Sequence, residues 1–390
     1  MKKKIIKILI GVLIFIVIVL GTLCIMDHIR MANNEEVIFS TWGKKYSAPI
    51  KESKGTNIVL TLHDEITENT AWCGTFQLIW NDLKNEIAKQ DIVFEPQLQV
   101  VENLNRGTFT TNDISENSYY KVYGIKTPEL KEEIEKAIKE KFSEKSDILG
   151  DFNWENNGSD EYFLYSMLKK EFEFEKQFSE LEDGTFGEYN NVEYFGIDSS
   201  TKKEIREQVE VLYYNSSEDF AIKLITKQND QVVIIKGAEE NTFYEIYQNS
   251  MKEAEKYEGH RNLAQLDTLK IPNIQFKVKE EFEELENKTF KFYNNDEYVI
   301  EQAIQTIEFE LDKSGGKIKS EAAMTANMSE APILDEIRDF IVDDTFTIFL
   351  QEEGKELPYF AARIDDISKF QTNNTKIERN EEVQKTENVR

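Results

Sequence analysis

The sequence has little of the material from which metal sites and nucleophilic active sites are built. Its 390 residues include only three histidines, His28, His63 and His260, and two cysteines, Cys24 and Cys73. No H-E-x-x-H, C-x-x-C or G-x-S-x-G motif occurs. These absences argue against a zinc site, a Ser-His-Asp triad and a disulfide framework, so we expect no metal and no cofactor.

Positive charge is also scarce. The chain has 47 lysines and arginines against 74 aspartates and glutamates, a net charge of −27. Proteins that bind nucleic acids neutralise phosphates with basic residues, so nucleic acid is not expected as a partner. An acidic surface keeps a protein soluble and non-adhesive. With 40% apolar and 12% aromatic residues, the chain is long enough to bury one sizeable core.

The N-terminus carries one long apolar run, Ile8–Met26, in which nineteen residues pass without a charge. The run is long enough to cross a bilayer, and the preceding Lys2–Lys4 predicts that the short N-terminal end stays in the cytoplasm. A cleaved signal peptide would need a shorter apolar region and small residues at the cut, which neither Gly21–Cys24 nor Arg30–Ala32 provides. Residues 1–26 are therefore predicted to be an uncleaved, single-pass anchor in the cell membrane.

The remainder is predicted to lie outside the cytoplasm as one domain. Residues 27–41 form a polar connector, and strand and helix signals then alternate through residues 42–370 without a Pro/Gly/Ser-rich linker. Residues 371–390 lack apolar periodicity and are predicted to be a disordered tail.

Three early elements can be placed from their patterns. Asn57–His63 is predicted to be a strand and Thr70–Lys89 an amphipathic helix. Pro128–Phe142 is predicted to be a second helix, because its apolar residues recur at a spacing of four and the opposite face is charged.

The segment Ile307–Ile364 begins and ends as β-strand and encloses a loop composed like a strand. Gly315-Gly316 and Pro332 mark the interior as a loop. Within it, small or apolar residues share one parity: Ser320, Ala322, Met324, Ala326 and Met328. Such alternation is typical of a strand with one buried face, so this loop is suited to enter a sheet.

Motifs downstream of the loop resemble those of the serpin family. Phe340–Phe346 (FIVDDTF) is similar to the family's F-x-A-D-[HR]-P-F signature, with Thr345 in place of proline. Tyr359–Ile364 resembles the closing strand that ends in G-R-V, with Ala362 in place of glycine.

The loop and three upstream stretches resemble the same family. Ser320–Ala326 is similar to the hinge G-T-E-A-A-A-A-T-A, with Lys319 where the hinge glycine stands. The upstream stretches follow in the family's order: Phe163–Lys170 with Phe174 and Phe178, then Val211–Tyr214 with Phe220–Ile225, then Leu269–Lys277. The resemblance covers about Tyr162–Phe370, more than half of the chain.

This resemblance implies a mixed α/β (α+β) fold with a large, mostly antiparallel sheet, further sheets, surrounding helices and an exposed reactive-site-like loop. It also implies inhibition of an extracytoplasmic serine or cysteine protease by insertion of that loop, without catalytic residues in this chain. The hinge would comprise Lys319, Ser320, Glu321, Ala322, Ala323, Met324, Thr325 and Ala326, and the scissile bond would join Ile333 to Leu334. No Lys or Arg lies between Lys319 and Arg338, so we expect a protease that prefers apolar residues; a trypsin-like protease would have to accept Arg338.

Two alternatives remain open. The bulky Lys319 at the hinge and the twenty positions from Ser320 to Phe340, fewer than inhibitory members usually have, favour a non-inhibitory serpin-fold surface or binding protein. The other alternative is a cysteine hydrolase that uses Cys73, His260 and Asn273. Cys73 is predicted to open a helix, whose N-terminus can lower the pKa of a thiol, although a cysteine in an apolar stripe is often merely buried.

Overall fold

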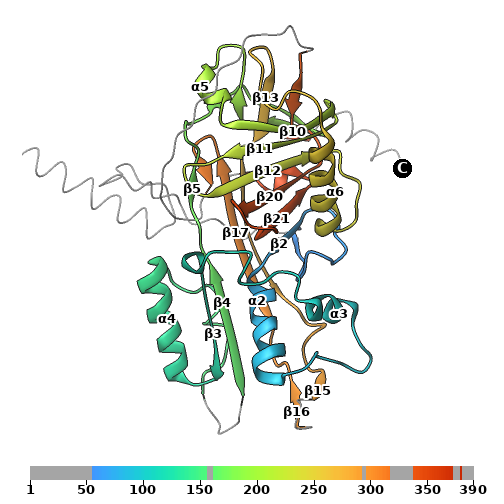
Figure 1. The fold of residues 1–390 in the computed structure, drawn as a ribbon. Coiled ribbons are helices and arrows are strands. Elements are labelled where there is room, and N and C mark those ends of the chain that lie inside the picture. Colours follow the sequence, from blue (N-terminus) through green and yellow to red (C-terminus); the bar gives the residue numbers. More distant parts are fainter. Residues whose placement is uncertain (1–54, 156–160, 292–295, 317–336, 372–377, 380–390) are drawn as a thin grey trace, which may run out of the picture. The chain divides into compact units, whose positions relative to one another are not determined.

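The computed structural model describes residues 55–155, 161–291, 296–316, 337–371 and 378–379, which belong to one compact unit, Glu52–Arg390 (Figure 1). No helix among these residues is long and apolar enough to cross a membrane. The predicted anchor and connector lie outside the described residues. The predicted mixed α/β class with a large, mostly antiparallel sheet is confirmed by the strand pairing that follows.

The largest sheet has seven strands in the order β1-β2-β21-β20-β12-β11-β10. All neighbours are antiparallel except β1 and β2. The strands are β1 (Asn57–Ile58), β2 (Thr70–Cys73), β10 (Val209–Ser216), β11 (Asp219–Ile225), β12 (Asp230–Lys236), β20 (Phe346–Glu352) and β21 (Phe360–Ile364). Residues on both faces of the central strands are buried, including the β-branched run Val232–Ile235, so this sheet lies within the core.

Two four-stranded sheets complete most of the β structure. One has the order β14-β17-β18-β5 and contains β5 (Phe172–Glu173), β14 (Ile274–Glu281), β17 (Ile304–Asp312) and β18 (Gly315–Gly316). The other has the order β19-β13-β9-β6 and contains β6 (Ser179–Glu180), β9 (Tyr194–Ile197), β13 (Thr268–Pro272) and β19 (Asp339–Ile341). The smaller groups are β3 (Tyr119–Ile125) with β4 (Tyr162–Leu168), β15 (Thr289–Lys291) with β16 (Glu297–Val299), and β7 (Gly184–Phe186) with β8 (Tyr189–Val192) and β22 (Glu378–Arg379).

The described helices are α2 (Thr75–Asp82), α3 (Gln99–Arg106), α4 (Pro128–Phe142), α5 (Lys203–Arg206) and α6 (Phe243–Lys256). The helix predicted at Pro128–Phe142 is confirmed. Thr127 caps it by accepting a hydrogen bond from the Leu130 N–H, and proline occupies the first turn, where its missing donor costs nothing. Figure 1 shows the β3–β4 pair between α4 and α2.

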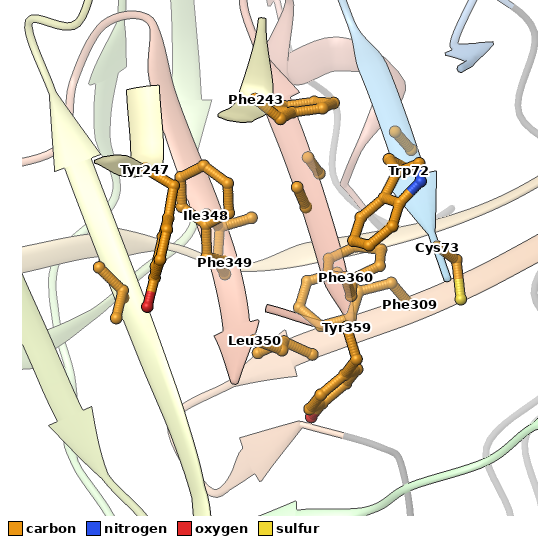
Figure 2. Packing of buried hydrophobic residues seen from close by; sticks show 14 of the residues in the cluster. Trp72, Cys73, Phe243, Tyr247, Phe309, Ile348, Phe349, Leu350, Tyr359 and Phe360 are labelled. Carbon is orange, nitrogen blue, oxygen red and sulfur yellow. The ribbon is translucent and has the colours of Figure 1, made fainter. Parts of the chain in front are cut away.

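Helix α6 packs on the seven-stranded sheet. The rings of Phe243 and Tyr247 lie 6.0 and 5.3 Å from that of Phe349 in β20 (Figure 2). A second apolar cluster lies beneath α4 and joins Ile134 and Ile138 to Phe163 and Tyr165 of β4. The two faces of β4 therefore serve different clusters, because Leu164 and Leu168 pack on the main core instead.

Three expectations are corrected here. Thr70–Lys89 does not form one helix: its first four residues are β2, fully buried between β1 and β21, and a π-helical turn, Leu83–Ala88, continues α2. Asn57–His63 is a strand only at its first two residues, since the Leu60 and Thr61 N–H groups donate to Asp64 and turn the chain. The tail is not without structure throughout, because Glu378–Arg379 pairs with β8.

Candidate functional site

The predicted hinge and scissile bond, Lys319–Ala326 and Ile333-Leu334, lie outside the described residues, in the segment 317–336. The described chain enters this segment from β18 and leaves it just before β19. The surroundings of these two ends therefore define the candidate site.

The strand β18 was not predicted, because a glycine pair indicated a break. It is antiparallel to β17 on one side, with Gly316 opposite Leu311, and antiparallel to β5 on the other, with Gly316 opposite Phe172. A Cβ on Gly315, whose φ is +143°, would lie 2.1 Å from the Phe172 carbonyl oxygen. Glycine is thus required sterically for the chain to fit between two strands at this point.

Below β18, no strand of the described residues pairs with both β4 and β17, and we call this unpaired place between them the vacant position. β4 continues into β5 and runs parallel to β17, yet β4 is paired only with β3, and β17 pairs with β14 and, at its end, β18. At the lower end, β4 and the chain beside it contact the residues that precede β17: the rings of Tyr162 in β4 and Tyr298 in β16 are 6.3 Å apart, and Lys126 contacts both Glu161 and Glu301. The vacant position is thus bounded by Gly315 and Gly316 at the C-terminal ends of β4 and β17, and by side chains near their N-terminal ends.

Polar atoms without partners collect on these two strands. Among the described residues, five buried side-chain oxygen or nitrogen atoms lack a hydrogen-bond partner, and three of them are Ser166 Oγ on β4, and Gln305 Oε1 and Thr306 Oγ1 on β17. A buried polar group without a partner costs on the order of 1–3 kcal/mol. These three unpartnered atoms on β4 and β17 therefore reduce the free energy of unfolding of the chain.

A buried ionic cluster fixes the β4–β5 junction to the seven-stranded sheet. The Lys170 ammonium group contacts Asp230 and lies 2.7 Å from Glu352 Oε1, and Tyr359 donates to Asp230 over 3.1 Å. Burial alone would raise the pKa of Glu352, but Lys170 and the hydrogen bonds from Ser115 outweigh it and lower that pKa. The sequence motif includes Lys170 but gave no sign of its partners.

Arg338 closes the segment at its other end. Its five N–H donors are all used: Nε and Nη2 donate to Asp267 Oδ2, Nη1 to the Tyr257 hydroxyl and the His260 carbonyl, and Nη2 also to the Asn262 carbonyl. The Arg338 residue is only 8% exposed. A trypsin-like protease could therefore accept Arg338 only if the side chain first left this cluster.

The cysteine-hydrolase alternative is not supported by its nucleophile. Cys73 ends strand β2 instead of opening a helix, and its side chain is buried beside Phe360 and Phe309 (Figure 2). Burial raises the pKa of the Cys73 thiol, the opposite of the shift that an attacking thiolate needs. Asn273 is engaged elsewhere, since its amide donates to Glu193.

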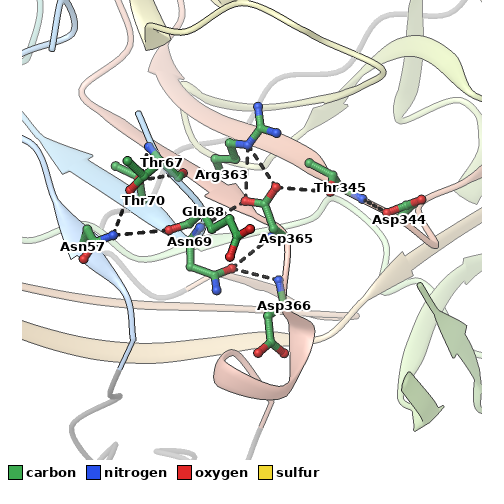
Figure 3. A network of polar contacts seen from close by, with 10 residues as sticks. All are labelled: Asn57, Thr67, Glu68, Asn69, Thr70, Asp344, Thr345, Arg363, Asp365 and Asp366. Atoms are coloured by element: carbon green, nitrogen blue, oxygen red, sulfur yellow. Dashed lines mark hydrogen bonds and ion pairs between the residues drawn. The ribbon is translucent and has the colours of Figure 1, made fainter. Parts of the chain in front are cut away.

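The residues that carry the serpin resemblance form a polar network where β20 begins and β21 ends. Thr345, which stands where the family has proline, donates through its hydroxyl to Asp365, to which Arg363 also donates (Figure 3). The Asn69 side chain accepts from the backbone N–H groups of Asp365 and Asp366, and Asn69 has φ 52°, a conformation that asparagine tolerates. The substituted motif thus still joins β2 to the C-terminal hairpin.

Comparison with solved structures returns proteins similar to this chain in fold. Serpin48 of the insect Tenebrio molitor, described as a highly specific serpin, has 14% identity and a TM-score of 0.35 over 60% of this chain and 63% of its own. Mouse protein-Z dependent protease inhibitor has 14% identity and a TM-score of 0.37 over 60% and 62%. Human thyroxine-binding globulin, complexed with thyroxine, has 12% identity and a TM-score of 0.37 over 61% and 64%.

The chain thus spans less than two thirds of the length of each of these structures. No protein-family model matches it, and no curated protein does.

Proposed function

We propose that this chain is a membrane-anchored, serpin-like protease inhibitor whose segment 317–336 is bait for an extracytoplasmic serine or cysteine protease. After cleavage, the part of the segment that follows β18 adds a strand between β17 and β4. The observation that supports this most is β18 itself: it lies antiparallel between β17 and β5, so a strand that continued β18 would run along the vacant position.

Continuing the register of β18 assigns a place to each inserted residue. Each step forward along the segment is one step back along both neighbouring strands, so Ala322 would lie between Gln305 and Ser166, two of the residues with unpartnered buried atoms. Even-numbered residues would share the face of Phe309 and Leu311, whose side chains point to the core. The small, apolar parity noted in the sequence is thus the parity that this register directs inward.

The same register accommodates Lys319, which the sequence marked as an obstacle. An odd-numbered residue would point away from the core, and Lys319 would lie opposite Glu308, whose side chain is on that outer face. The basic residue at the hinge would then gain a carboxylate partner instead of entering the core. Lys319 at this place is compatible with insertion.

The target is proposed to be a protease that prefers apolar residues. No Lys or Arg lies between Lys319 and Arg338, and Arg338 itself is bound to Asp267. The anchor at residues 1–26 would bind the lipid bilayer and display the rest of the chain on the outer face of the membrane. The alternative is a non-inhibitory surface or binding protein whose cleaved segment also adds a strand to the sheet. The experiment below distinguishes it from an inhibitor.

The test is cleavage of the full-length chain with an elastase- or subtilisin-like protease, followed by thermal unfolding and by electrophoresis in SDS. We expect cleavage within 317–336 to raise the midpoint by about 10 °C or more, since each new backbone hydrogen bond contributes about 1 kcal/mol and buried methionines add about 1.5–3 kcal/mol each. Met324→Asp should abolish the rise, because it forces a charge into the core. Thr325→Asp, one residue on and facing outward, is the matched control and should keep it.

The outcomes separate the candidates. A stability rise together with an SDS-stable complex between chain and protease supports an inhibitor. A rise without such a complex supports the non-inhibitory alternative. Equal melting of intact and cleaved chains, or equal effects of the two aspartate variants, would show that the segment does not add a strand.

A further inference from the structure

Three ionisable side chains meet in the interior, each from a different part of the chain. Lys170 lies between β4 and β5, Asp230 begins β12, and Glu352 ends β20. Asp230 and Glu352 are opposite one another in the antiparallel β12–β20 ladder, and the Lys170 ammonium group contacts both carboxyl groups. The three side chains are 5%, 3% and 5% exposed. One amine and two carboxyl groups are therefore held together away from water.

The two carboxyl groups differ in how readily they take up a proton. Burial raises the pKa of Asp230 more than Lys170 lowers it, so Asp230 is protonated more easily than an ordinary aspartate. In spite of its burial, the pKa of Glu352 is lowered by Lys170 and by the hydrogen bonds that Ser115 donates to its Oε2. Ser118 donates to Glu352 Oε1 as well. The amine of Lys170 thus has a potential carboxylic acid on one side and a carboxylate base on the other.

Tyr359 places a further donor on the same aspartate. Its hydroxyl donates to Asp230 Oδ1 over 3.1 Å, and its ring centre lies 4.6 Å from Lys170 Nζ. Burial, then the charge of Asp230, raises the pKa of Tyr359, so the hydroxyl keeps its proton. A fixed donor at this oxygen stabilises the negative charge that develops when a nucleophile attacks the carboxyl carbon. The contacts therefore provide a nucleophile, an acceptor carbon, a base and a donor in one buried site.

We infer that Lys170 and Asp230 condense to form an amide bond between Lys170 Nζ and Asp230 Cγ, with loss of one water molecule. This covalent cross-link is a modification site that does not depend on the function proposed above. Glu352 accepts one proton from the ammonium group, and the nitrogen lone pair then attacks Cγ of the protonated Asp230 carboxyl group. A second proton passes from the nitrogen to the hydroxyl group of that carboxyl, which leaves as water. The product keeps one N–H, and Glu352 ends protonated, so the step consumes no oxidant or other reactant.

Lys236 provides an internal control. Its side chain is also buried, 3% exposed, and it has two carboxylate partners, Asp343 at 2.7 Å and Glu218 at 2.9 Å. These carboxylates, however, are 42% and 73% exposed. Burial alone would lower the pKa of Lys236, but its hydrogen bonds to Asp343 and Glu218 outweigh it and raise that pKa. An ammonium group beside two hydrated carboxylates does not condense, so no cross-link is expected at Lys236.

The test is peptide mapping of the full-length natural chain by mass spectrometry after denaturation and digestion with trypsin. Trypsin cannot cut after a lysine whose side chain is an amide. We therefore expect residues 170–176 joined to residues 228–236, with the summed mass of the two peptides less one water. The cut that ends the second peptide follows Lys236 and reports that this control lysine is free. Recovery of the two peptides only as separate species, with a cut after Lys170, would overturn the inference.

Three variants test the assigned chemistry. Lys170→Arg keeps the positive charge but should abolish the cross-link. Asp230→Asn should give a cross-linked product of the same mass as the natural one, because the carboxamide loses ammonia where the acid loses water. Glu352→Gln keeps the shape of the side chain but removes the base, and should slow cross-linking by about a hundredfold. Equally fast cross-linking in Glu352→Gln would refute the role of Glu352, and a cross-link at Lys236 would refute the requirement for buried carboxyl groups.

Discussion

Arg338→Met is the substitution whose cost can be worked out most fully from the structure. Methionine keeps the apolar part of the side chain but removes all five donors. Asp267, whose side chain is 1% exposed, then loses its ion pair, although the N–H groups of Ala264 and Arg338 still donate to it and Arg206 still interacts with it electrostatically. The carbonyl oxygens of His260 and Asn262 also lose their donors.

Removing one partner from a buried ion pair costs about 3–5 kcal/mol, because the remaining charge is left in a poorly solvated site. For a chain of this length we expect a fall in the melting midpoint of about 5 °C or more. Urea unfolding of the full-length chain measures the loss of unfolding free energy directly, and a parallel shift of the curve would show that the change lies in stability and not in compactness.

Two further variants test whether the unpaired carboxylate of Asp267 causes the loss of unfolding free energy. Arg338→Met/Asp267→Asn removes the remaining charge as well and should be more stable than Arg338→Met alone. Lys291→Met removes one member of an ion pair whose side chains are 61% and 63% exposed, and should cost less than about 1 kcal/mol. If Arg338→Met is as mild as Lys291→Met, or if the double variant is the least stable of the three, the buried pair is not what holds the end of the segment.

Two further predictions concern the lower end of the vacant position and the anchor. The hydrogen bond that protonated Glu301 donates to Glu161, then partial burial, raises the pKa of Glu301, so the folded chain holds this proton more tightly than the unfolded chain. The contact should therefore protect residues 298–304 from hydrogen exchange at acidic pH, and this protection should be lost as the pH rises through the raised pKa. Glu161→Gln should remove this pH dependence. A pH-independent exchange rate in the natural chain would contradict the assignment. The mature protein should retain residues 1–26 in the membrane fraction, so an intact mass that begins downstream of Met26 would refute the anchor.

The sequence alone predicted the elements whose pattern is local. The apolar spacing of four and the N-terminal Thr-Pro pair of α4 are sufficient, because a helix is specified by neighbours along the chain. The alternation around Met324 is also a local pattern, but its residues lie outside the described residues, so the strand it predicts stays a prediction. The mixed fold class followed from the order of the motifs, each of which covers one or two strands.

The elements that could not be predicted depend on partners distant in the chain. Thr70–Cys73 resembles the start of a helix, yet it is a strand because β1 and β21 bury both of its faces. Lys170 looks like a solvated end of a strand, but Asp230, sixty residues away, and Glu352 draw it into the interior. Gly315-Gly316 signals a turn, and only the clash that a Cβ would make with Phe172 reveals why glycine is needed there.

Different interactions fix the chain on the two sides of segment 317–336: backbone hydrogen bonds of β18 before it and side-chain hydrogen bonds of Arg338 after it. This difference determines from which end the proposed insertion would start. The N-terminal end leaves from β18, whose two residues carry no side chains and are fixed by backbone rungs that an extending strand would simply continue. The C-terminal end is fixed by the buried side chain of Arg338, which must lose all five of its hydrogen bonds before it can move. A cut between these ends therefore frees an arm on the side of β18, while the other arm stays on β19. Only a continuation of β18 would run between β17 and β4, so the proposed strand addition would proceed from that end.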